Sequence, residues 1–123
     1  MAVDAHQFDG YKYINLETYK KNGKPILTPV WFVIENNLIF IVTRSSTGKV
    51  KRLKNNPNVR IMPCGFRGES KGKWVCGIAK FINSNESARI VNLRNKKYGI
   101  TAKLISLFTL RKGKFIIISI QIT

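Results

Sequence analysis

The highest density of residues that could do chemistry lies between positions 43 and 52, where an apolar stretch gives way to hydroxyl groups, a glycine and four basic side chains. Residues 45–48 (Ser-Ser-Thr-Gly) are typical of a helix start, and the first backbone amides of a helix have no partner within it. Because these amides lie at the positive end of the helix dipole, phosphate groups bind there readily. The segment therefore indicates a phosphate site at a strand-to-helix junction.

The spacing of the basic residues divides them between two sides of this expected helix. If Val50 and Leu53 face inward, Lys49 and Arg52 share one flank of the helix. Lys51 and Lys54 share the other flank. One flank can close on a phosphate while the other faces solvent or a further anionic group. The alternative is an ordinary capped helix with a solvated basic face.

Pro29 is the second unusual feature, since it lies inside the strongest strand candidate, residues 25–34. Proline cannot donate to a strand ladder, so it marks an edge, a bulge or a wall that faces something other than a strand. Together with Thr28, Val30 and Trp31 it could form a flat apolar surface for a planar ring. A simple edge-strand proline is the alternative.

Several other kinds of site are excluded. His6 is the only histidine, so neither a zinc finger nor a Ser-His-Asp triad is expected, no metal site is predicted, and no catalytic side chain is assigned. Residues 68–73 are one residue short of a Walker loop, and Trp74 stands where that loop needs serine or threonine. Cys64 and Cys76 are too few for a disulfide scaffold.

Composition sets the wider limits. The 123 residues suit a single domain, 1–123, and contain 22 Lys and Arg against 6 Asp and Glu, a net charge of +16. A protein with such an excess of positive charge usually binds an anionic partner. Nucleic acid, an acidic membrane surface or a phosphorylated cofactor would each fit. Because no apolar stretch approaches the roughly 20 residues of a spanning helix and the first residues lack a signal pattern, a cytoplasmic protein without membrane association is expected.

The apolar pattern predicts a mainly β chain with a few short helices. Helices are expected to start at residues 45–48, at 84 or 85, and at 101, and residues 1–8 are expected to be mobile. Apolar residues on both strand faces favour a closed barrel with one wall covered by a partner or ligand. The six expected strands are residues 13–16, 25–34, 38–43, 59–65, 74–82 and 114–123.

Taken in order, these segments resemble a known family. Residues 13–18 and 23–32 resemble its opening hairpin, residues 47–64 contain three motifs of its cofactor-binding centre, and Lys97-Tyr98-Gly99 resembles a late helix end. From about Phe8 onward the chain is similar to the flavin-binding split barrels related to pyridoxamine 5′-phosphate oxidase, and specifically to their deazaflavin-dependent oxidoreductase branch.

This resemblance implies a six-stranded antiparallel split β-barrel that forms a homodimer, with two cofactors in clefts between the subunits. The ring of the cofactor would lie beside residues 28–31, and Pro63 and Cys64 would border the cleft. True pyridoxamine phosphate oxidases end in a basic segment with a histidine, whereas this chain ends in the apolar residues 115–123, so that activity is not expected. The residues implied to hold the phosphate are Thr43, Ser45, Ser46, Lys49 and Arg52, with Lys51 as an additional contact.

The resulting hypothesis is an oxidoreductase that transfers a hydride between coenzyme F420, or FMN, and a small conjugated substrate. F420 is favoured over FMN because its lactyl-oligoglutamate tail adds negative charge, and residues 44–60 contain six basic residues and no acidic one. A cofactor carrier without turnover is the first alternative. Nucleic-acid binding rests on the net charge alone and is not expected, because no recognition motif accompanies it.

Overall fold

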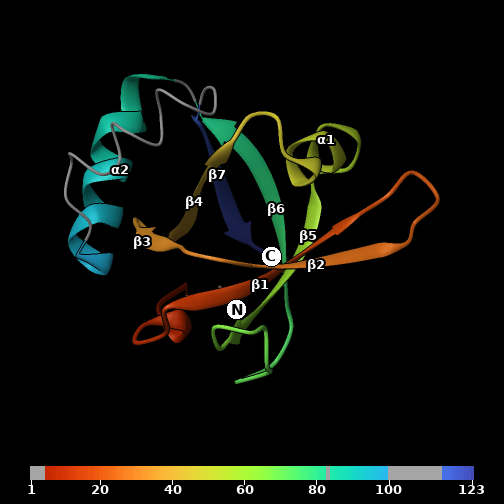
Figure 1. Ribbon diagram of the computed structural model, residues 1–123, viewed down its shortest axis with the longest axis horizontal. Coiled ribbons are helices and arrows are strands. Elements are labelled where there is room, and N and C mark those ends of the chain that lie inside the picture. The colour runs from red at the N-terminus through yellow and green to blue at the C-terminus, as the bar shows by residue number, and fades with distance from the viewer. Residues whose placement is uncertain (1–4, 83, 100–114) are drawn as a thin grey trace.

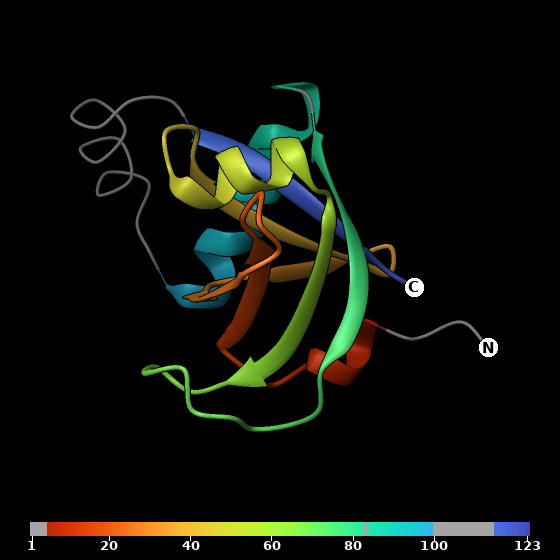
Figure 2. The ribbon, with the colours of Figure 1, turned by 90° about the vertical axis from the view of Figure 1, so that its right-hand side faces the viewer.

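The computed structural model describes residues 5–82, 84–99 and 115–123, which form one antiparallel sheet curled into a split barrel with helices around it (Figure 1, Figure 2). The order of strands across the sheet is β2-β1-β5-β6-β7-β4-β3. The helices are the 3₁₀ helix η1 (Ala5–Phe8), α1 (Gly48–Asn55) and α2 (Ser84–Tyr98). The strands are β1 (Tyr13–Tyr19), β2 (Pro25–Val30), β3 (Val33–Glu35), β4 (Leu38–Arg44), β5 (Asn58–Cys64), β6 (Val75–Ile82) and β7 (Phe115–Ile122).

The described residues contain seven strands where six were predicted, because the stretch 25–34 is divided into β2 and β3 at Trp31 and Phe32. β2 and β3 are the two edges of the sheet, so this junction carries the chain from one edge to the other. The backbone amide of Phe32 donates to the hydroxyl of Tyr98, 2.9 Å away, rather than to a neighbouring strand. The loss of ladder bonding at this junction explains the extra strand, and the predicted split barrel is confirmed.

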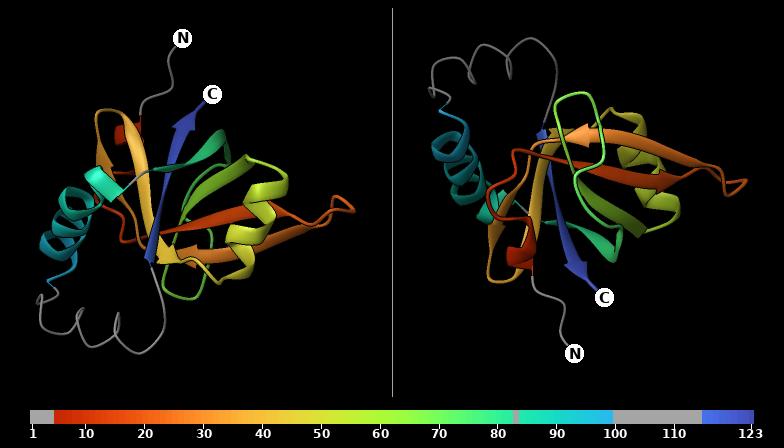
Figure 3. Two further views of the ribbon diagram at one scale, coloured as in Figure 1. Left: turned by 90° about the horizontal axis from the view of Figure 1, so that it is seen from above. Right: turned by 90° about the horizontal axis from the view of Figure 1, so that it is seen from below.

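The core lies inside the curled sheet, and a second apolar cluster lies outside it. Buried side chains of β1, β4, β5 and β7 fill the interior, whereas α2 covers the outer face of β3 and β4 with Ile90 packed near Val33 and Phe40. Figure 3 shows α2 on one side of the barrel and α1 on the other, next to the β1–β2 hairpin. Val50 and Leu53 form the buried side of α1, as their spacing predicted.

Two turns in the described residues have the backbone geometry that their residue types favour. Asn36 and Asn37, between β3 and β4, both have positive φ values, 51° and 59°, which suit a tight hairpin turn. Gly99 follows α2 with φ 66°, as expected of a glycine that ends a helix. The helix expected to start at residue 101 lies outside the described residues.

The prediction of a mobile start at residues 1–8 is wrong for residues 5–8. Ala5 and Phe8 in η1 are fully buried, and the amide of Ala5 donates to the side-chain oxygen of Asn37 at 2.7 Å. Phe8 also packs edge-on against Phe32, with 6.3 Å between ring centroids. Two buried side chains and this hydrogen bond anchor the segment to the core.

None of the helices in the described residues is both long and apolar enough to cross a membrane. The same part of the chain contains no group of three or more His, Cys, Asp or Glu side chains that could hold a metal ion.

Gly77 marks a place where β6 has no room for a side chain. A Cβ atom there would lie 2.8 Å from Cγ2 of the fully buried Ile120 and 3.0 Å from the backbone oxygen of Gln121. We therefore expect Gly77→Ala to reduce the free energy of unfolding by about 1–3 kcal/mol through overpacking. Urea denaturation tests this, with Cys76→Ala at the exposed neighbouring position as the matched control, which we expect to be close to neutral.

Candidate functional site

The N-terminus of α1 is left without a side-chain cap. Thr47 occupies the N-cap position, but its hydroxyl donates to the carbonyl oxygen of Arg44 at 3.0 Å and makes no cap bond to an amide of the helix. The first turn, which begins at Gly48, contains no acidic residue. The positive end of the helix dipole is thus not offset by the helix's own side chains.

Arg52 brings a second positive charge to this helix terminus. Its Nε donates to the hydroxyl oxygen of the fully buried Thr18 at 2.6 Å, which fixes the side chain against β1. Its guanidinium also lies across Gly48, since a Cβ at that glycine would come within 2.8 Å of Nη1. Arg52 therefore lies over the N-terminal turn rather than extending into solvent.

Lys49 supplies the third positive element. Its side chain is half-buried, and burial, together with the charge of Arg52, lowers the pKa of its ammonium group. No described acidic side chain neutralises the charge of Lys49 or Arg52, because each described carboxylate is bonded to another residue. These partnerships are Asp9 with His6, Glu17 with Arg60, Glu35 with Arg89, and Glu69 with the backbone amide of Arg67. Two adjacent cations and free helix amides, without a carboxylate, make a site that an anion would stabilise.

The β1 strand relates this anion site to the predicted ring-binding residues. Thr18, which holds Arg52, is paired with Ile26 of β2, and Thr28 and Val30 follow on the same face of β2, opposite Leu16 and Ile14. Diagonal neighbours across a strand pair are about 7–8 Å apart. Thr28 thus lies about this distance from Thr18, the residue that binds Arg52. Arg52 and the inner side of β2 are therefore close to each other.

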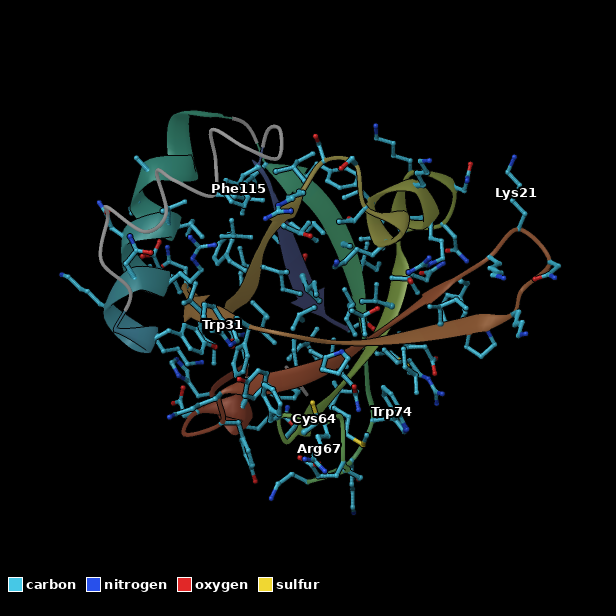
Figure 4. All side chains as sticks on the ribbon, in the orientation of Figure 1. Lys21, Trp31, Cys64, Arg67, Trp74 and Phe115 are labelled. Carbon is cyan, nitrogen blue, oxygen red and sulfur yellow. The ribbon has the colours of Figure 1, made fainter. Side chains whose placement is uncertain are left out.

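Pro29 and Trp31 lie differently from Thr28 and Val30. Pro29 is exposed on the edge strand β2, opposite the buried Asn15, which agrees with the rule for prolines in sheets. Trp31 lies at the β2–β3 junction and is 36% exposed. Its ring stacks on that of Tyr98 from α2, with centroids 4.4 Å apart and an interplanar angle of 8°. Figure 4 shows Trp31 on the side of the molecule where α2 ends.

The two residues predicted to border the cleft, Pro63 and Cys64, are both buried at the end of β5. The β5–β6 loop, residues 65–74, folds back over them: Gly72 would place a Cβ 3.1 Å from the Pro63 ring. Asn15 Nδ2 also donates to the carbonyl oxygen of Gly68 at 2.8 Å. Cys64 is only 3% exposed, and burial raises the pKa of its thiol. Figure 4 shows Cys64 beside this loop, near the labelled Arg67.

The twelve predicted site residues do not all face one space. Arg52 lies over the start of α1, bonded to Thr18, and its charge acts on the half-buried Lys49. Ser45, Ser46 and Lys51 are exposed around that helix start, whereas Thr43 is buried in β4, 8% exposed. Thr18 was not predicted, because nothing in the sequence of a strand marks one threonine as the hydrogen-bond acceptor for an arginine 34 residues away.

Arg60, one of the six basic residues counted above, is not available to an anion at α1. Its Nε and Nη2 donate to the two carboxylate oxygens of Glu17 at 2.7 and 3.0 Å, and its guanidinium lies over the ring of Trp74. Glu17 is 4% exposed and also accepts from the hydroxyl of Tyr19. The hydrogen bonds from Arg60 hold the pKa of this buried carboxyl below its ordinary value.

Comparison with known proteins agrees with this architecture. Curated protein sequences give no match. The chain is similar in structure to the haem storage protein HutZ of Vibrio cholerae, with 19% identity, a TM-score of 0.73, and coverage of 97% of this chain and 85% of that one. It is similar to an F420 reductase (18% identity, TM-score 0.69, 96% and 92% coverage) and to a putative pyridoxamine 5′-phosphate oxidase of Listeria innocua (14%, 0.68, 94% and 86%).

These structural likenesses, at low identity, concern the fold. The sequence itself matches the family model described as pyridoxamine 5′-phosphate oxidase over residues 7–123, nearly the whole chain. That match covers β1 to β7, including α1, the β2–β3 junction and the β5–β6 loop. The chain therefore belongs to the pyridoxamine 5′-phosphate oxidase family.

Proposed function

We propose that this protein is an oxidoreductase that binds a phosphorylated flavin-type cofactor and transfers a hydride between it and a small conjugated substrate. The observation that supports this most is the meeting of Lys49, Arg52 and the uncapped N-terminus of α1 without any described carboxylate. A phosphate dianion would offset the cost of keeping Lys49 charged where it is half-buried.

The residues around this position suit the rest of such a cofactor. Thr28, one strand step from Thr18, and Val30 offer surface on the inner side of β2. Trp31 adds a partly exposed aromatic ring at the β2–β3 junction. When bound, the cofactor would supply the hydride chemistry, so the protein's task is to bind, orient and shield it. No side chain in the sequence stands out as a general acid, which is compatible with a reaction whose chemistry the cofactor supplies.

Between the two cofactors we favour F420 over FMN. After Arg60 is set aside as the partner of Glu17, Arg44, Lys49, Lys51, Arg52 and Lys54 still surround the start and flanks of α1. An electropositive surface of this kind favours the more anionic ligand and speeds its capture.

Isothermal titration of the purified protein with F420 and with FMN tests the assignment. We expect both to bind, F420 more tightly; FMN binding tenfold tighter, about 1.4 kcal/mol, would reverse the order, and no binding of either would refute the proposal. Reoxidation of the bound reduced cofactor by conjugated acceptors distinguishes an oxidoreductase from a carrier.

Haemin serves as the comparison ligand in these titrations, because one of the structural neighbours is a haem storage protein. Haem iron is most often held by histidine, cysteine, methionine or tyrosine. His6, the only histidine, is exposed in η1 and bonded to Asp9, and Cys64 is buried beneath the β5–β6 loop. We therefore expect weak haemin binding without the spectrum of histidine ligation.

We also propose that the protein acts as a homodimer with the cofactor near the subunit boundary. The outer face of the β2-β1-β5-β6 part of the sheet carries no helix of its own among the described residues, and Leu27 and Ile78 on it are 52% and 41% exposed. Sedimentation equilibrium with and without F420 tests this: a monomer in both states would contradict it.

A further inference from the structure

The stacked pair of Trp31 and Tyr98 is an aromatic contact that the proposed cofactor site does not by itself explain. The two rings are nearly parallel and in van der Waals contact, a geometry in which each fixes the orientation of the other. Tyr98 can cover only one face of the indole. Since 36% of Trp31 remains exposed, part of the indole stays open to a ligand.

The hydroxyl of Tyr98 is bonded to the backbone on either side of the site. It accepts from the amide of Phe32 at 2.9 Å and lies 2.8 Å from the carbonyl oxygen of Lys12 and 2.9 Å from that of Phe32, to either of which it can give its single proton. Burial raises the pKa of this phenol to about 12, so it stays protonated at physiological pH. Tyr98 thus joins α2 to the β2–β3 junction and to the segment that leads into β1.

The neighbouring Lys97 reinforces the same junction. Its Nζ donates to the carbonyl oxygen of Phe32 at 2.9 Å and lies 3.4 Å from the centroid of the Phe32 ring. The backbone at Phe32, which has left the strand ladder, therefore has both its amide and its carbonyl held by side chains of α2. Without these bonds, Trp31 would lie in a segment between the two sheet edges whose neighbouring backbone has no hydrogen-bond partners.

We propose that Tyr98 is a positioning residue for the ring-binding surface, which fixes Trp31 in the orientation that meets the planar ring of a cofactor. It does so in two ways, by stacking on the indole and by holding the adjacent backbone at Phe32. This inference rests on the proposed function, because it needs a planar ring to bind beside Trp31. It assigns Tyr98 no contact with the reacting atoms.

Two variants separate the two contributions. Tyr98→Phe keeps the stacked ring and removes the hydroxyl, whereas Tyr98→Leu removes both, so the affinity for FMN or F420 should fall by about threefold in the first and about tenfold in the second. Stabilisation by inorganic phosphate, measured as a shift of the thermal midpoint, should be unchanged in both. Phosphate engages Lys49 and Arg52 but not Trp31, so a general loss of structure would reduce both responses.

Trp31 itself provides the direct readout. The chain has two tryptophans, so in a Trp74→Phe background the emission comes from Trp31 alone. Bound FMN should quench this emission strongly when Tyr98 is present, and less at saturation in Tyr98→Leu. Should Tyr98→Leu fail to fold, Tyr98→Phe in the same background still decides the question through its FMN affinity and quenching.

The outcomes are distinct. If the wild-type protein binds FMN or F420 but both Tyr98 variants bind it equally well, the positioning role is refuted and the proposed function stands. An equal loss of phosphate and cofactor responses would also refute it, because the role would then be structural. If the wild-type protein binds neither cofactor, both proposals fail together.

Discussion

Replacing Lys49 with alanine should weaken cofactor binding by about 10–150-fold, or 1.5–3 kcal/mol, through loss of a charge-assisted bond to the phosphate. Lys49 is half-buried beside Arg52 and has no described acidic partner, so the anion is the group that would compensate its burial. Its charge also adds to the positive end of α1, where Thr47 provides no side-chain cap. Isothermal titration with F420 and FMN measures the effect.

Two controls make this result specific to Lys49. Lys54→Ala removes the same charge from the exposed last turn of α1, so affinity should change by less than about threefold. Lys49→Arg keeps the charge, and because arginine does not lose its proton in the accessible pH range, it should also abolish any fall in affinity at high pH. In the wild-type protein that fall should begin below the pH at which an ordinary lysine titrates, because the pKa of Lys49 is lowered. Equal losses in Lys49→Ala and Lys54→Ala would indicate diffuse attraction rather than a phosphate site.

The sequence predicted the strands well because their apolar residues and the turn residues between them are local signals. Asn36 and Asn37 specify a hairpin turn by their tolerance of positive φ, and Val50 and Leu53 mark the buried side of α1 by their spacing. The break at Trp31 and Phe32 could not be predicted, since it depends on Tyr98, 66 residues further on, which takes the amide that a strand would have used. Because the residues on both sides of the break are apolar, the sequence shows no sign that the chain passes there from one edge of the sheet to the other.

The candidate site was predictable to the extent that its residues are neighbours in the chain. Lys49 and Arg52 were placed on one flank of a helix by their spacing alone. In the structure Arg52 lies over Gly48, and its charge lowers the pKa of Lys49. The contributions of Thr18 and Tyr98 arise from tertiary contacts and leave no local signal. The number of basic residues available to an anion was overestimated from the sequence. Arg60 pairs with the buried Glu17 on another strand, and this contact is visible only in the fold.

The buried N-terminal segment provides the largest expected effect on stability. Phe8 is fully buried and packs edge-on against Phe32, with the rings 79° apart. Truncating a buried phenylalanine removes its transfer free energy and leaves a cavity, so Phe8→Ala should lower the free energy of unfolding by about 3–5 kcal/mol. Urea denaturation of the full chain measures this, with an unchanged m-value as the sign that the change lies in stability.

Phe8→Leu is the matched control, because it keeps most of the apolar volume and should cost only about 1–2 kcal/mol. If residues 5–8 were mobile, both substitutions would leave the denaturation midpoint nearly unchanged. Phe32, which Phe8 supports, is also the residue whose backbone Tyr98 and Lys97 hold next to Trp31. In Phe8→Ala we therefore expect a modest fall in FMN affinity under conditions where the variant is fully folded. Thermal stabilisation by inorganic phosphate should persist there, because Lys49 and Arg52 are held by α1 and Thr18 instead.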